Sequence, residues 1–118
     1  MARTESKQRR GARRSRRSKA QLDQLVARAT ADAFGESEQR TGLFTMLEGH
    51  LELPFAARVL GVHVLVEAID LTQAGEIVAI CRRGRSWQRV PILELPLPTP
   101  PPGGAEWIEA YRHWAGAS

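Results

Sequence analysis

The 118-residue chain lacks several features that would assign it to a class at once. Its single cysteine, Cys81, cannot form an internal disulfide, which excludes the small secreted domains held together by disulfides. No apolar run approaches the roughly 18 residues that indicate a membrane-spanning helix. Glycine-rich phosphate loops, Gly-x-Ser-x-Gly and paired-histidine motifs are absent, so we do not expect an enzyme. The length is sufficient for one domain with a modest core.

The first 18 residues contain no Leu, Ile, Val, Phe or Trp, so they have no large apolar side chain to bury. Nine basic residues and one acidic residue give residues 1–19 a charge of +8. The rest of the chain carries eight basic and twelve acidic residues, a charge of −4. We therefore expect residues 1–18 to form a disordered basic arm and residues 19–118 to form a single domain.

Arginines dominate this arm, and guanidinium groups on a flexible chain are suited to phosphates. Each can form paired charge-assisted hydrogen bonds and displace condensed counterions. No aromatic residue is interleaved, so the arm itself cannot stack on bases. Two interpretations stay open, a solubilising tail or attachment to nucleic acid or another polyanion. For the second, the candidate residues are Arg9, Arg10, Arg13, Arg14, Arg16 and Arg17.

The basic start is not followed by the apolar segment of a secretory signal peptide, because residues 19–28 are amphipathic and polar. We therefore expect a cytoplasmic protein without a membrane span. A start rich in Arg and Ser and poor in acids also matches the composition of an organellar transit peptide, which stays an alternative.

Hydrophobic periodicity predicts helices followed by strands. Apolar side chains recur at helical spacing from Ala20 to Gly35 and again from Leu43 to Leu51, which predicts two short helices. From Pro54 to Val90 they alternate, which predicts four short strands, with a tight hairpin at residues 83–86. Beyond the proline-rich segment 91–102, one face of a C-terminal helix carries Trp107, Ile108, Tyr111 and Trp114.

These elements predict an α+β domain. We expect the two N-terminal helices to pack on a small, bent antiparallel sheet of the SH3-like barrel type, followed by a short C-terminal helix. The aromatic face of that last helix should pack on the body, since it would otherwise expose a large apolar patch.

The histidines and the cysteine are too scattered for a zinc site, so carboxylates are the remaining candidates for metal binding. Glu48 and Glu52 are four residues apart at the end of the second predicted helix and can share a face. Asp70 lies just past the second predicted strand, beside a turn. Carboxylates at element ends are hard oxygen ligands of the kind that Ca²⁺ takes, although ordinary surface solvation is the alternative.

Two stretches of the chain, residues 31–39 (ADAFGESEQ) and residues 47–55 (LEGHLELPF), with Gly42 between them, resemble calcium-binding proteins of the CcbP type. These are small bacterial proteins without an EF-hand, and the resemblance covers about residues 29–95. It implies calcium binding or buffering, with Gly49 standing where the family commonly has an aspartate. The candidate ligands Glu48, Glu52 and Asp70 follow from charge and position in this chain. The alternative function is nucleic-acid association through the basic arm.

Overall fold

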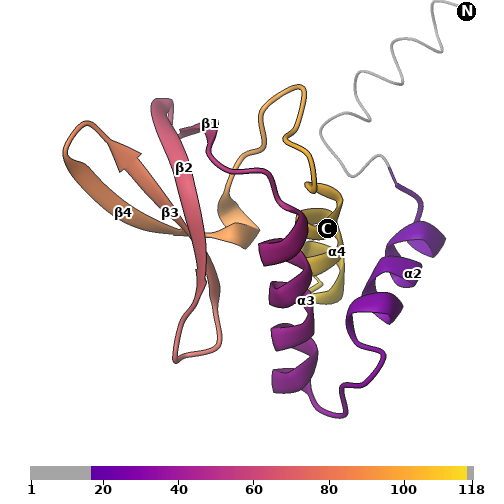
Figure 1. Cartoon of the computed structure of the whole chain (residues 1–118). Coiled ribbons are helices and arrows are strands. Elements are labelled where there is room, and N and C mark those ends of the chain that lie inside the picture. The colour runs from indigo at the N-terminus through magenta and orange to yellow at the C-terminus, as the bar shows by residue number, and fades with distance from the viewer. Residues whose placement is uncertain (1–16, 117–118) are drawn as a thin grey trace, which may run out of the picture.

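The computed structural model describes residues 17–116 and confirms the α+β class (Figure 1). This part of the chain contains three α-helices, a short 3₁₀ helix and one four-stranded sheet. The helices are α2 (Lys19–Ala29), α3 (Glu36–His50), η1 (Ile92–Glu94) and α4 (Glu106–Trp114). The strands are β1 (Phe55–Val59), β2 (Val62–Leu71), β3 (Ile77–Arg83) and β4 (Ser86–Pro91). None of the described helices is long and apolar enough to cross a membrane.

The sheet is an open antiparallel meander in the order β1-β2-β3-β4. Within the described residues β1 and β4 are its two edges, so closure into an SH3-like barrel is not confirmed. The chain leaves the sheet at Pro91, which has no backbone N–H to donate to a ladder. The segment that follows forms η1 and leads to α4, and does not return as a further strand beside β1.

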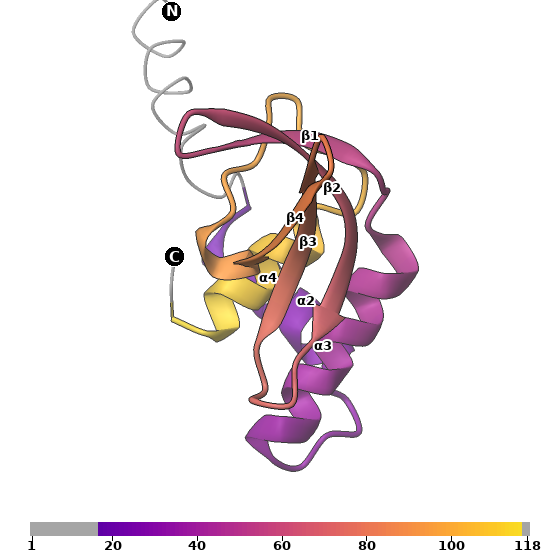
Figure 2. The same cartoon turned by 90° about the vertical axis from the view of Figure 1, so that its left-hand side faces the viewer.

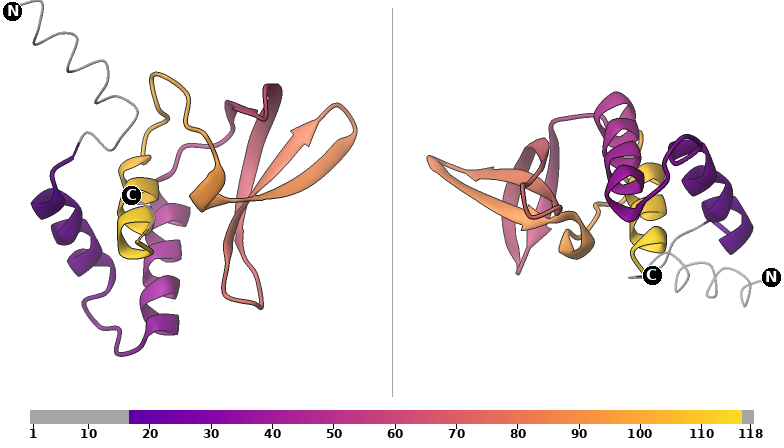
Figure 3. Two further views of the ribbon diagram at one scale, coloured as in Figure 1. Left: turned by 180° about the vertical axis from the view of Figure 1, so that it is seen from behind. Right: turned by 90° about the horizontal axis from the view of Figure 1, so that it is seen from below.

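The helices form two layers against this sheet (Figures 2 and 3). Helix α3 contacts β2, and α4 contacts η1, which in turn contacts β3. Helix α2 packs on α4 and α3, and Figure 3 shows it on the side away from the sheet. The predicted arrangement, with both N-terminal helices on the sheet, is therefore not confirmed. A reason is the narrow apolar face of α2, which buries only Leu22, whereas α4 buries four side chains.

Close approach of α3 to the end of α2 depends on Gly42. A Cβ atom at this position would lie 2.2 Å from the carbonyl oxygen of Ala29, so a larger residue would force the two helices apart. The core lies between α3, α4 and the inner face of the sheet. As predicted, the C-terminal helix packs on the body, because Trp107, Ile108 and Tyr111 are buried.

Arg112 holds the segment after β4 against α4. Its Nε and Nη2 atoms donate to the carbonyl oxygen of Ile92 at 3.2 and 2.9 Å, and Nη2 also donates to the carbonyl of Leu95. Burial lowers the pKa of Arg112. These bonds satisfy backbone acceptors at a place where the chain is neither strand nor α-helix.

The β1–β2 and β3–β4 hairpins have two-residue turns, and the first of these contains a strained position. Leu60 has φ of +52° and is 96% exposed, and Gly61 follows with φ of +78°. Positive φ at both residues is the pattern of a type I′ turn, which Asn-Gly fills at lower cost than Leu-Gly. We expect Leu60→Asn to raise the free energy of unfolding by about 0.5–1 kcal/mol, measured by urea denaturation. Leu60→Ala also has a Cβ but lacks the short polar side chain with which Asn hydrogen-bonds locally at positive φ, so it should give no comparable gain. Equal stability of the two variants would contradict this explanation.

Candidate functional site

The three predicted calcium ligands lie on different elements. Glu48 is exposed in the last turn of α3, and Glu52 is exposed just beyond it, with its carboxylate against Gly103. Asp70 lies within β2, not just past a strand as predicted, because β2 continues to Leu71. Its Oδ2 atom is 3.1 Å from Nη1 of Arg89, so this carboxylate already has a cationic partner.

Across residues 17–116 no group of three His, Cys, Asp or Glu side chains is arranged to hold a metal ion. Burial raises the pKa of the Cys81 thiol, which disfavours the thiolate needed by a soft metal. Calcium binding stays a prediction based on the resemblance, and the ligands Glu48, Glu52 and Asp70 stay a prediction based on charge and position in the chain.

Charge is distributed unevenly over the fold. The sheet region, residues 55–91, holds five arginines and three acidic residues. The helical segments 19–54 and 92–116 hold four basic and nine acidic residues. The helical segments therefore carry a net charge of −5, and the sheet region carries +2.

Within the sheet the positive charge is concentrated at one end. The start of β2 pairs with the end of β3, so the β1–β2 and β3–β4 turns lie at the same end, opposite the β2–β3 turn (Figure 2). Asp70 and Glu76 lie toward the β2–β3 turn. We call the other end the basic hairpin end, formed by Arg58, His63, Arg82, Arg83, Arg85 and Trp87.

The β3–β4 hairpin supplies most of this charge and extends away from the helices (Figure 1). Its turn has Gly84 at the first position with φ of +60°, as a type II′ turn requires, and Arg85 follows. Residues 82–89 contain four arginines and no acidic residue. Because side chains alternate along a strand, Arg82 and Arg83 point to opposite faces of the sheet.

Trp87 and Arg82 are cross-strand neighbours on the face turned away from the helices. The Arg82 guanidinium carbon is 5.8 Å from the centre of the Trp87 ring, within cation–π distance. Its Nε atom also pairs with Oε2 of Glu67 at 2.7 Å. Trp87 is 56% exposed, although tryptophan is among the most apolar residues, so an oriented aromatic ring is presented to solvent beside a cation.

The other cations of the basic hairpin end are available to an external anion. Nη2 of Arg58 donates to Nε2 of His63 at 3.0 Å, so its hydrogen-bond partner carries no negative charge. In the part of the chain that the structure describes, Arg58, Arg83 and Arg85 have no carboxylate partner. Repulsion among them would be relieved by a bound polyanion.

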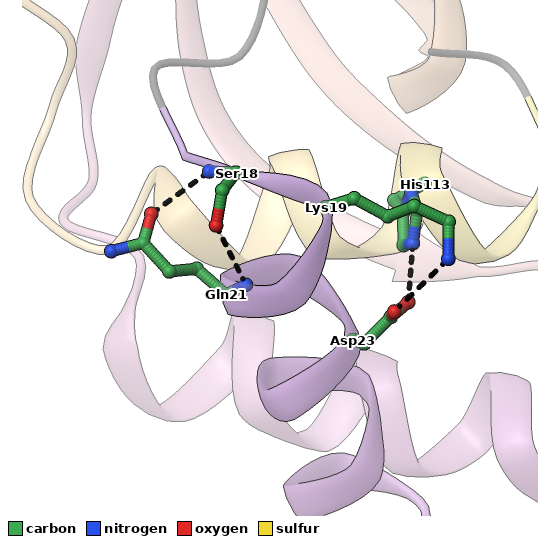
Figure 4. Close-up of polar contacts among 5 residues, drawn as sticks. All are labelled: Ser18, Lys19, Gln21, Asp23 and His113. Atoms are coloured by element: carbon green, nitrogen blue, oxygen red, sulfur yellow. Dashed lines mark hydrogen bonds and ion pairs between the residues drawn. The ribbon is translucent and has the colours of Figure 1, made fainter.

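The basic arm joins the domain at a well-defined helix start. Ser18 Oγ accepts a hydrogen bond from the backbone N–H of Gln21 at 3.1 Å, and Gln21 Oε1 accepts one from the N–H of Ser18 at 2.8 Å (Figure 4). This reciprocal capping box begins α2 at Lys19. Residues 1–16 of the predicted disordered arm lie outside the described residues.

Two side-chain contacts tie the beginning of α2 to α4. Nη1 of Arg17 is 3.0 Å from Oε1 of Glu109, and Nε2 of His113 is 2.7 Å from Oδ1 of Asp23 (Figure 4). The hydrogen bond from His113, and then the one from Lys19, lower the pKa of Asp23. Arg17, a predicted phosphate contact, therefore pairs within the domain, while Arg9, Arg10, Arg13, Arg14 and Arg16 lie outside the described residues.

The sequence pattern predicted only a tight turn at residues 83–86, and the basic hairpin end was not predicted. The pattern that could have revealed it is the run of four arginines and one tryptophan in residues 82–89, uninterrupted by acidic residues. The contribution of Arg58 and His63 could not have been recognised in this way, since it depends on strand register.

Comparison of the chain with protein-family models, curated proteins and solved structures gives no match.

Proposed function

We propose that this protein binds the polyanionic phosphate backbone of a nucleic acid, using the basic hairpin end together with the N-terminal arm. The observation that carries the proposal is the separation of charge in the folded domain. On the projecting β3–β4 hairpin Arg82 and Arg89 pair with carboxylates, whereas Arg83 and Arg85 have no carboxylate partner among the described residues. Nine of the twelve acidic residues in residues 17–116 lie in the helical segments. A surface of this kind attracts a polyanion to one end of the molecule and repels it from the other.

The arm and the basic hairpin end leave the domain in different places. Helix α2, which the arm precedes in the chain, lies on the side of α4 away from the sheet (Figure 3). Sixteen residues can span at most about 55 Å when fully extended, which is sufficient to pass around a small domain. Two attachment sites on one chain raise the effective concentration of each for the same nucleic acid. The arm would then supply affinity, and the hairpin would orient the domain.

Calcium binding is the competing proposal and rests on the resemblance to the CcbP type. Within residues 17–116 no group of three His, Cys, Asp or Glu side chains, Glu48, Glu52 and Asp70 included, is placed to hold a metal ion. Calorimetric titration of the full chain with Ca²⁺ tests it directly. Heat released by Ca²⁺, together with no binding of an oligonucleotide, would favour calcium over nucleic acid.

The nucleic-acid proposal is tested by the salt dependence of binding. A fluorescein-labelled 20-base-pair duplex is titrated with the full chain between 50 and 200 mM NaCl, roughly the range in which phosphate contacts show strong salt dependence. Replacing Arg83 and Arg85 by Gln should weaken binding about tenfold or more and reduce the slope of log K against log [salt] by up to about 2.

Arg83→Lys with Arg85→Lys is the matched control, because it keeps both charges and should keep most of the slope. Equal binding by the Gln and Lys double variants would remove the hairpin from the interface. No salt-dependent binding by the wild-type chain at 50 mM NaCl would reject the function itself.

A further inference from the structure

The outward face of the basic hairpin end has the composition of a stacking surface. One cross-strand row on this face runs from Ala56 through Leu65 and Arg82 to Trp87. Trp87 is 56% exposed, while Trp107 in the core is 2% exposed. The neighbour of Trp87 in this row is Arg82, and Leu65 follows one strand further on, so the ring borders a cation at the edge of the sheet.

We infer that the nucleic acid bound at the basic hairpin end is single-stranded, with an unpaired base stacked on Trp87. This inference rests on the proposed function and specifies its substrate. In a duplex, the faces of the bases are covered by their neighbours along the helix, so an exposed indole ring finds no partner there. A single strand offers base faces to aromatic rings and guanidinium planes, and such stacking does not depend on base identity.

The charged residues around Trp87 indicate where the backbone of that strand would lie. Arg85, in the turn two residues before Trp87, can provide a phosphate contact close to the ring, whereas Arg83 points to the opposite face of the sheet. Arg58 lies on β1, the edge strand opposite β4. Three strand spacings separate these two strands, a distance of about 14 Å. A nucleic-acid strand passing from Arg85 toward Arg58 would run alongside the row that contains Trp87 and Leu65, on the side of the two hairpin turns.

Acidic residues limit how far the bound nucleic acid can extend toward the β2–β3 turn. Glu67 is paired with Arg82, and Asp70 is paired with Arg89 nearer the β2–β3 turn. Phosphates close to these carboxylates would be repelled, since like charges raise the energy of the complex. The bound strand is therefore confined to the basic hairpin end, and the remainder of the outward face is left uncovered.

The test measures the affinity of the full chain for dT20, rU20 and the 20-base-pair duplex at 100 mM NaCl. Trp87→Ala should weaken binding to both single strands about 5- to 150-fold, the range for one base–aromatic stack. Binding to the duplex should change less than about twofold. Trp87→Phe should retain most of the single-strand affinity, because it keeps an aromatic face. If Trp87→Ala weakened binding to dT20 alone, the ligand would be DNA, and if it weakened binding to rU20 alone, the ligand would be RNA.

Phe34→Ala is the matched control, since Phe34 is an aromatic residue that is 94% exposed and lies between α2 and α3, outside the basic hairpin end. It should leave all three affinities unchanged. Intrinsic fluorescence gives a second measurement: dT20 should quench the wild-type emission, and Trp87→Phe should abolish that quenching although Trp107 and Trp114 remain. The thermal unfolding of each variant checks its fold.

Equal binding of dT20 by wild-type protein and Trp87→Ala, with no quenching, would overturn the single-strand inference and leave the proposed function intact. Absence of salt-dependent binding to all three oligonucleotides would overturn both. Equal losses of single-strand and duplex affinity in Trp87→Ala would also contradict base stacking, since that outcome would show that Trp87 supports the position of the arginines.

Discussion

Replacing Arg9, Arg10, Arg13, Arg14 and Arg16 together by Gln is expected to weaken nucleic-acid binding by about 10² to 10⁴-fold at 0.1 M salt. Each arginine that contacts a phosphate releases a condensed counterion, and five such contacts contribute up to about 4–5 to the slope of log K against log [salt]. The arm has no aromatic residue, so the loss should be the same for dT20 and for duplex DNA.

Arg17 is left unchanged in this variant because it pairs with Glu109, and its loss would mix an effect on folding with an effect on binding. The five-Gln chain keeps the length of the arm, so changes in reach do not contribute. Its free energy of unfolding should equal that of the wild type. If the affinity and its salt dependence were unchanged, the arm would be a solubilising tail, and the basic hairpin end would have to account for binding alone.

Trp107→Ala is expected to lower the free energy of unfolding by about 3–5 kcal/mol, measured by urea denaturation. The side chain is 2% exposed, and its ring stacks on His50 of α3 at 5.8 Å. The guanidinium of Arg28 in α2 lies 5.4 Å from the same ring. Trp107 therefore joins α4 to both other helices, and truncation would leave a cavity between all three.

Trp114→Ala is the comparison for this prediction. Trp114 is only partly buried, donates from Nε1 to Gln39 Oε1 at 2.9 Å and stacks on Tyr111 at 5.9 Å. Its removal should cost clearly less than that of Trp107, because less apolar surface is returned to water. Equal losses in the two variants would contradict the explanation that the cost follows the apolar surface returned to water.

Much of the secondary structure was predictable because it depends on neighbours in sequence. The N-terminal helices and the alternating strands follow from hydrophobic periodicity, and Gly84 at the first turn position is typical of a type II′ hairpin. The burial of the C-terminal aromatic face followed from its apolar character. The end of β2 was predicted less accurately. The strand was expected to end before the polar residue Asp70, which instead pairs with Val78 inside the ladder.

The arrangement of these elements was not predictable in the same way. Whether α2 or α4 lies against α3 and the sheet depends on which apolar faces are wide enough to bury each other, and periodicity describes one helix at a time. Closure of a sheet likewise depends on where the chain goes after its last strand. Here Pro91 and η1 direct it toward the helices.

By itself the sequence determined that a strongly basic segment precedes an acidic body, and that residues 82–89 carry four arginines beside a tryptophan. Only the tertiary structure decided that Arg58 and His63 join those arginines, because antiparallel register places both hairpin turns at one end of the sheet. It also decided that Trp87 faces solvent, since the helices cover the opposite face, and that Asp70 is occupied by Arg89, 19 residues further along the chain. Contacts of this range depend on strand pairing, which local sequence does not specify.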